Sequence, residues 1–132
     1  MKKEFKKQDN LDFEIAFYEG ILKYSPNFTE ALIALGDHYT KRGLYEKGLN
    51  VDERLAKLKP EDPLVFYNLA CSYSLLGDID KSLQSIEQAV KRGYKDFSYL
   101  EHDADLIKLR ADDRFQQFLS KIKGKADSLK TS

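Results

Sequence analysis

This 132-residue chain has two histidines and one cysteine, so catalysis or metal binding would depend mainly on its carboxylates. The densest group is the segment 101–105, which offers one imidazole and three carboxylates. One histidine with carboxylates in a turn makes a poor zinc site, and the spacing differs from that of a calcium-binding loop. We therefore expect Asp103 and Asp105 to cap backbone amides or to pair with Arg110 and Arg114, and we expect neither a metal nor a cofactor.

Two further side chains could act chemically, and neither has a suitable neighbour. His38 has no nucleophile or second acid near it in sequence, which favours a half-buried packing role over that of a general base. Cys71, the only cysteine, has no helix N-terminus or adjacent cation to lower its pKa, so a reactive thiol is not expected. The sequence also has no glycine-rich phosphate loop. It therefore predicts a protein that is not an enzyme.

The composition is that of a single globular domain made of helices. Hydrophobic residues make up 42% and charged residues 33% of the chain, and there are three prolines. Four of the first seven residues are lysines, and four more lie from residue 121 onward, which indicates solubilising ends and not a nucleic-acid-binding face. With one cysteine, no apolar leader and no membrane-length apolar run, we expect a cytoplasmic protein without a membrane span.

Helices are the elements that must position these side chains. Apolar residues at helical spacing predict a first helix over residues 11–23, ended by the proline at position 26. Glycines and prolines then mark the ends of four further predicted helices, over about 29–42, 45–58, 63–76 and 79–92. Asp96 should cap a short helix, and a last helix should follow residues 112–113. The pattern predicts about six to seven helices and no strands.

The chain repeats itself at about 34 residues. Leu-Gly-x-x-Tyr at 35–39 returns as Leu-Ala-x-x-Tyr at 69–73, and Gly43 returns as Gly77. A fixed period of this length is typical of helix-turn-helix arrays, whose helix pairs stack into a continuous core. Arrays of this kind usually bind other proteins and do not transform small molecules.

These residues resemble tetratricopeptide repeats. The resemblance implies an all-α solenoid of antiparallel helix pairs, wound as a right-handed superhelix, with a concave groove lined by the first helix of each pair. Residues 97–123 also resemble the degenerate ending of bacterial arrays of this family. The whole chain, 1–132, is then one domain. Its parts are a basic tail (1–10), the second helix of a partial repeat (11–28), two repeats (29–62 and 63–96), capping helices (97–123) and a tail (124–132).

Helical geometry locates the groove that the resemblance implies. If Leu35 and Tyr39 face the core, the stripe rotated by about 100° faces the concave side. The predicted groove residues from the two repeats are Ile33, Asp37, Thr40, Tyr67, Cys71 and Ser74, with Asn68 at the border. The alternative is that Tyr67 and Cys71 only pack between neighbouring repeats.

The groove residues bear on the kind of partner, a peptide or helix of another protein. Some family members hold an acidic peptide end with lysine, asparagine and arginine side chains. The corresponding residues here are Ile33, Asp37, Asn68, Ser98 and His102, of which only Asn68 matches. We therefore expect no binding of an acidic peptide end. Asp37 and Glu30 suit a neutral or basic extended peptide or a helix.

Self-assembly is the alternative function. The predicted first helix has apolar residues on two sides, and an array end without a polar cap tends to associate. Phe13, Phe17 and Tyr18 would then form a homodimer interface.

Overall fold

The computed structural model describes the backbone of residues 2–131 and the side chains of residues 10–125. Every regular element in this range is helical, which confirms the predicted all-α solenoid of antiparallel helix pairs. The elements in order are α1 (Lys2–Tyr24), α2 (Thr29–Arg42), α3 (Tyr45–Leu58), α4 (Pro63–Leu76), α5 (Ile79–Lys91), α6 (Phe97–His102), the 3-10 helix η1 (Ala104–Leu106), α7 (Ile107–Arg110) and α8 (Asp113–Thr131).

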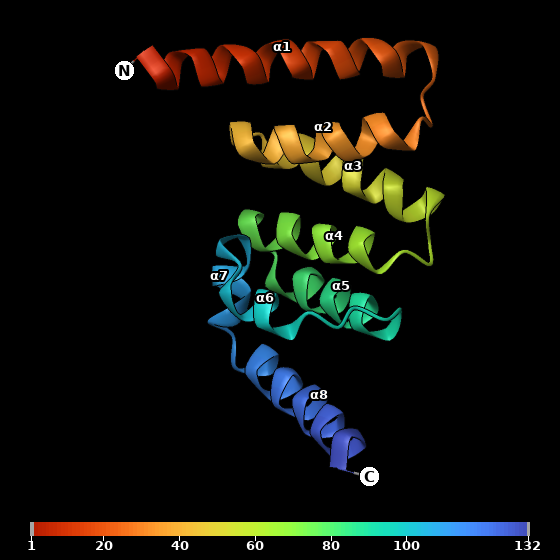
Figure 1. The fold of residues 1–132 in the computed structure, drawn as a ribbon, viewed down its shortest axis with the longest axis vertical. Helices are drawn as coiled ribbons and strands as arrows, with labels where there is room; N and C mark the ends of the chain where they lie inside the picture. The colour runs from red at the N-terminus through yellow and green to blue at the C-terminus, as the bar shows by residue number, and fades with distance from the viewer. Residues whose placement is uncertain (1, 132) are drawn as a thin grey trace.

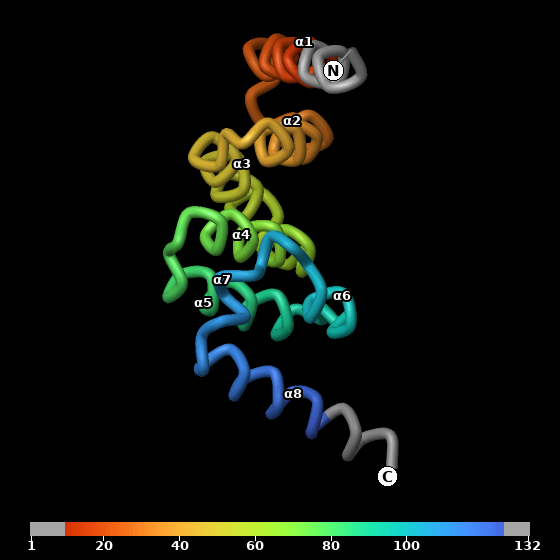
Figure 2. The backbone as a smooth tube through the Cα atoms, turned by 90° about the vertical axis from the view of Figure 1, so that its left-hand side faces the viewer, coloured from red at the N-terminus to blue at the C-terminus, as the bar shows by residue number. Residues whose placement is uncertain are grey.

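The helices stack along the long axis of the molecule (Figure 1). α2 pairs with α3 and α4 pairs with α5, and contacts between α3 and α4 join the two pairs. α1 packs against α2 at one end of the stack, and α8 lies at the other end (Figures 1 and 2).

Matching turn signals give the two pairs the same geometry. Gly43 and Gly77 end α2 and α4 in the left-handed region, each with φ of 84°, where a side chain would be strained. Before α4, the Asp62 carboxylate accepts a hydrogen bond from the Leu64 amide at 3.0 Å, and Pro63 takes the first helical position. These local signals explain why the helix ends fall close to the positions expected from the sequence.

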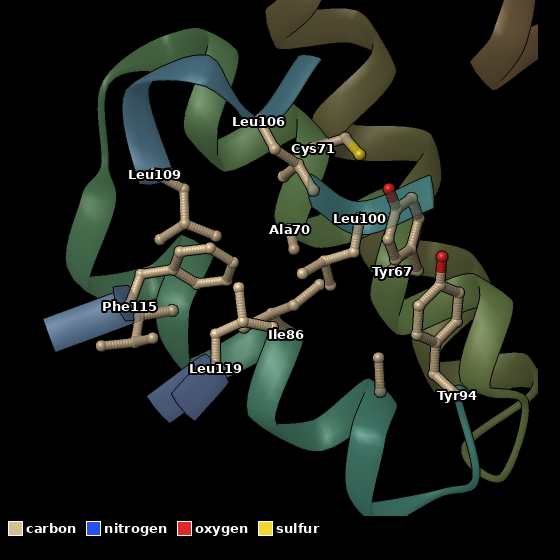
Figure 3. Packing of buried hydrophobic residues seen from close by; sticks show 12 residues of the cluster. Tyr67, Ala70, Cys71, Ile86, Tyr94, Leu100, Leu106, Leu109, Phe115 and Leu119 are labelled. Carbon is tan, nitrogen blue, oxygen red and sulfur yellow. The ribbon is translucent and has the colours of Figure 1, made fainter. Parts of the chain in front are cut away.

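The core consists of two clusters of buried side chains. One lies between α1, α2, α3 and the start of α4 and includes Leu32 and Leu55. The other joins α4 and α5 to the C-terminal helices, and there the fully buried Phe115 packs with Leu109 and Ile86 (Figure 3). Phe115 therefore covers the end of the array, and Phe118 is partly buried against the same cluster.

The two segments expected as tails belong to helices. α1 begins at Lys2 and not at Leu11, and α8 continues to Thr131. Lysine, glutamate and glutamine are good helix formers, and no glycine or proline interrupts the first 19 residues. The predicted solubilising role of the terminal lysines concerns side chains that mostly lie outside the described residues.

Candidate functional site

A groove of about 760 Å³ lies along α2 and α4 and is bounded at one end by residues 94–105. Six of the seven residues expected in a groove line it, namely Ile33, Asp37, Thr40, Tyr67, Asn68 and Cys71. Sequence reasoning missed several others, among them Leu64 on α4, Tyr94, Asp96, Tyr99, Asp103 and Asp105 from the C-terminal segment, and Asp52 on α3.

The prediction for Ser74 is wrong. This side chain is fully buried, and its hydroxyl accepts a hydrogen bond from the Leu109 amide at 3.2 Å. Tyr67 and Ser74 lie on the same face of α4, two helical turns apart. At Tyr67 this face borders the groove, but at Ser74 it is covered because η1 and α7 pack against the end of α4. Ser74 therefore fixes the C-terminal cap and does not face the groove.

Side chains of α2 form one wall of the groove. Ile33 is exposed, and the Asp37 carboxylate pairs with Lys41 Nζ at 2.9 Å. Thr40 donates its hydroxyl to the Gly36 carbonyl at 3.1 Å, so this group is already bonded within the helix. Asp37 and Ile33 are the members of this wall that a partner can reach.

His38 joins α1 to α2. Its Nε2 lies 2.5 Å from Glu14 Oε2 on α1, and its ring lies 5.7 Å from the ring of Tyr18, centroid to centroid. These contacts support the packing role expected for His38. Tyr18 is therefore half-buried between two helices and also reaches the groove.

Tyr67 and Cys71 form the floor of the groove. Both are buried in the second core cluster, where they pack with the C-terminal segment, and both also line the groove. The alternative that they only pack between neighbouring repeats therefore does not describe their position. Tyr67 stacks on Tyr94 with ring centroids 4.5 Å apart (Figure 3). The Tyr67 hydroxyl donates a hydrogen bond to Asp103 Oδ2 at 2.6 Å. The Cys71 sulfur lies 3.8 Å from the same carboxylate oxygen.

This environment keeps the floor of the groove neutral. Burial, with a smaller contribution from the negative charge of Asp103, raises the pKa of the Cys71 thiol far above its ordinary value. Burial and the hydrogen bond to Asp103 do the same for the pKa of Tyr67. The thiolate is the nucleophilic form of cysteine, so this arrangement disfavours covalent chemistry at Cys71.

The acidic segment 101–105 does not come together as one cluster. His102 Nδ1 lies 2.8 Å from the Ser98 carbonyl, and Glu101 pairs with Lys123. Asp103 and Asp105 instead gather around Cys71, with one potential ligand atom of each residue within 4.8 Å of the others. No pattern in the sequence indicated this meeting, because Cys71 comes from a different helix.

The backbone role predicted for Asp103 is confirmed. Its Oδ1 accepts a hydrogen bond from the Asp105 amide at 2.9 Å. The alternative, ion pairs of these aspartates with Arg110 and Arg114, is not what the described residues form. Arg110 donates to the carbonyls of Leu100 and Asp103, at 3.2 and 2.5 Å. Arg114 pairs instead with two other aspartates, Asp112 and Asp80.

Asp52 is a buried carboxylate beside the groove. It is 6% exposed and accepts a hydrogen bond from the Ser72 hydroxyl at 2.5 Å. Burial raises the pKa of Asp52 to about 6. A Cβ added at Gly36 would lie 3.2 Å from Asp52 Oδ1, so glycine at this position leaves room for the carboxylate.

The aromatic residues proposed for self-association differ in exposure. Phe13 is 74% and Phe17 is 56% exposed on α1, whereas Tyr18 is half-buried. The rings of Phe17 and Tyr18 meet edge to face at 5.3 Å. Phe13 and Phe17 are therefore the accessible pair.

Comparison with known proteins identifies the fold. No family model matches the chain. A curated relative, a chloroplastic protein of Arabidopsis thaliana, is 36% identical over 90 residues, which cover 66% of this chain and 27% of that protein. The chain thus spans only about a quarter of the length of this relative.

Solved structures with the same arrangement include MamA proteins. "MamA 41-end from Desulfovibrio magneticus RS-1" superimposes with a TM-score of 0.68 and 17% identity, over 92% of this chain and 71% of that one. A second structure, "Crystal structure of MamA protein", gives a TM-score of 0.63 and 19% identity, over 81% and 55% of the two chains. The fold is a tetratricopeptide-like α-solenoid.

Proposed function

We propose that this protein is a non-catalytic interaction module that binds a peptide or a helix of a partner protein in the groove along α2 and α4. The observation that carries the proposal is the apolar rim of the groove. Ile33 on α2, Leu64 on α4 and Tyr99 on α6 are 45%, 60% and 56% exposed and line one concavity. Exposed apolar side chains gathered in a groove are typical of sites that receive peptide segments.

The chemistry of the groove supports binding over catalysis. His38 is paired with Glu14, and burial raises the pKa of the Cys71 thiol, which disfavours the nucleophilic thiolate. The described residues of the groove therefore do not place a free base beside an activated nucleophile. The solenoid fold, shared with the MamA structures, offers a rigid concave surface made of several helices.

Selected peptides provide the test. Peptides from a random display library, selected on the full chain, should bind with an affinity that Ile33→Arg reduces by about tenfold or more, since a charged side chain would fill the groove. Leu44→Arg is the matched control, because Leu44 is 40% exposed and does not line the groove. Equal binding to both variants and to the unmodified chain would contradict the proposal.

Self-assembly through α1 is the second candidate, favoured by the exposure of Phe13 and Phe17. α1 packs against α2, and these two rings lie on its exposed surface. A second copy of the chain would cover them. Light scattering over a dilution series should then show a dimer that Phe17→Asp converts to a monomer and Leu76→Asp, at an exposed site on α4, does not. A monomer at every concentration would exclude this candidate.

We further propose that the chain belongs to the tetratricopeptide repeat family, with residues 29–62 and 63–96 as repeats, 11–28 as a second helix and 97–123 as the cap. The repeat period and the paired helices α2–α3 and α4–α5 support this division. The cytoplasmic location stays a prediction, and the Arabidopsis relative is named as chloroplastic. Within the described part of the chain, no helix has the length and apolar character needed to cross a membrane.

A further inference from the structure

Among the residues with described side chains, the groove is predominantly acidic. Its described lining includes five aspartates, Asp37, Asp52, Asp96, Asp103 and Asp105, together with His38, which pairs with Glu14, and it includes neither lysine nor arginine. The acids come from α2, from α3 and from the segment after α5, so they surround the concavity instead of following one helix. A groove with this lining attracts cationic groups and repels anionic ones.

The nearby basic residues leave much of this charge unpaired. Lys41 pairs with Asp37 at the rim, and Arg110 uses its guanidinium on two backbone carbonyls. Among the residues with described side chains, no lysine or arginine nitrogen lies within 4.0 Å of the carboxylate of Asp96 or Asp105. A cation supplied by a partner would therefore not have to displace an existing ion pair at these two residues.

Acidic side chains face the groove from both walls. Asp37 lies on α2 and Asp105 on η1, and both line the same concavity. Burial raises the pKa of Asp105, and the negative charges of Asp103 and Asp37 raise it further. A positive charge between the walls is stabilised by both walls at once.

Aromatic rings complete this end of the groove. Tyr99 is largely exposed, and its ring lies 6.1 Å from that of Tyr67, which stacks on Tyr94. Tyrosine faces attract ammonium and guanidinium groups, and they also pack against the aliphatic stems of lysine and arginine. The carboxylates of the groove therefore suit the positive group of a lysine or arginine side chain, and the ring faces suit its aliphatic stem.

We propose that the partner segment is basic and places a lysine or arginine side chain between Tyr99, Asp105 and Asp96 at the C-terminal end of the groove. This inference rests on the proposed function, and it specifies which class of peptide the groove accepts. The apolar rim at Ile33 and Leu64 then holds neighbouring apolar side chains of the same segment, while the aspartates select for its positive charge.

The selected peptides distinguish this inference from the proposed function. Peptides selected on the full chain should be enriched in lysine and arginine, and their affinity, measured by fluorescence anisotropy, should fall as salt is raised. Replacing the basic residue of a selected peptide by glutamine should weaken binding about tenfold or more. Asp105→Asn and Asp96→Asn should each have a similar effect, since asparagine keeps the capping geometry of Asp96.

Glu87→Gln is the charge-matched control, because Glu87 is exposed on α5 and outside the groove. Circular dichroism of each variant checks that the helices are retained. Suppose that the selected peptides lack basic residues and that Ile33→Arg abolishes their binding. This result would support the proposed function but overturn this inference. Failure to select any peptide that depends on the groove would overturn both.

Discussion

Asp52 should reduce the stability of the folded protein at neutral pH. Its carboxylate is buried beside the groove and has one hydrogen bond, from Ser72. Burial raises the pKa of Asp52 from 3.8 to about 6, which means that the folded state holds this proton more tightly than the unfolded chain does. Since one pKa unit corresponds to about 1.4 kcal/mol, the ionised carboxylate costs about 3 kcal/mol above pH 6.

The sign of the pH dependence follows from the raised pKa. The contribution of Asp52 to stability is most favourable below pH 3.8, and it is lost as the pH rises through about 6. Asparagine has nearly the same shape, is always neutral and can still accept the Ser72 hydroxyl. Its amide hydrogens need partners of their own, which subtracts from the gain. We therefore expect Asp52→Asn to raise the free energy of unfolding by about 1–3 kcal/mol at pH ~7.5 and to have little effect at pH ~4.

Urea unfolding followed by circular dichroism measures this difference. Wild type and variant are compared at each pH, so that the other carboxylates cancel. Glu87→Gln is the control, since Glu87 is exposed on α5, away from Asp52, and should change stability little at either pH. A loss of stability in Asp52→Asn at pH ~7.5, or a gain of equal size at both pH values, would show that ionisation of this buried carboxylate does not oppose folding.

Three further predictions concern the core, the thiol and the partner. Phe115→Ala should lower the free energy of unfolding by about 3–5 kcal/mol, because the ring is fully buried, whereas Phe13→Ala should change it by under about 0.5 kcal/mol in urea unfolding, provided that the chain is a monomer. Cys71 should resist a thiol reagent in the native protein and react in urea, and rapid native labelling would show that the thiol is accessible and ionised. A peptide with an acidic C-terminus should show no micromolar binding in a fluorescence titration, since Asp37 stands where the family's clamp needs a neutral amide. Low-micromolar affinity would contradict this expectation.

The repeat architecture could be predicted because its signals are local. The glycines at 43 and 77 and the Asp62-Pro63 pair fix the helix ends through their own backbone geometry, whatever packs around them. Placing one stripe of α2 and α4 on the groove needed only helical periodicity, and it succeeded for all three residues of α2 and for Tyr67 and Cys71 on α4. The start of α1 was missed because the charged helix formers before Leu11 carry no stop signal, and the end of α8 was missed because this helix continues through Gly124.

The errors at the site arise from contacts between segments distant in sequence. Ser74 obeys the same periodicity as Tyr67, but α7 returns over the end of α4 and buries it. The meeting of Cys71 with Asp103 depends on where the chain turns after α5, which no local pattern fixes. Asp52 is a charge among apolar positions of its helix, and that mismatch is the signal in the sequence that could have indicated its place beside the groove.

A nuclear magnetic resonance titration of the isotope-labelled chain with a selected peptide would decide whether the groove is the binding site. If it is, the amide signals of Ile33, Asn68 and Tyr99 should shift together and saturate at one affinity. Shifts confined to α1 around Phe13 and Phe17 would place binding at the exposed end of the stack and contradict the proposed function.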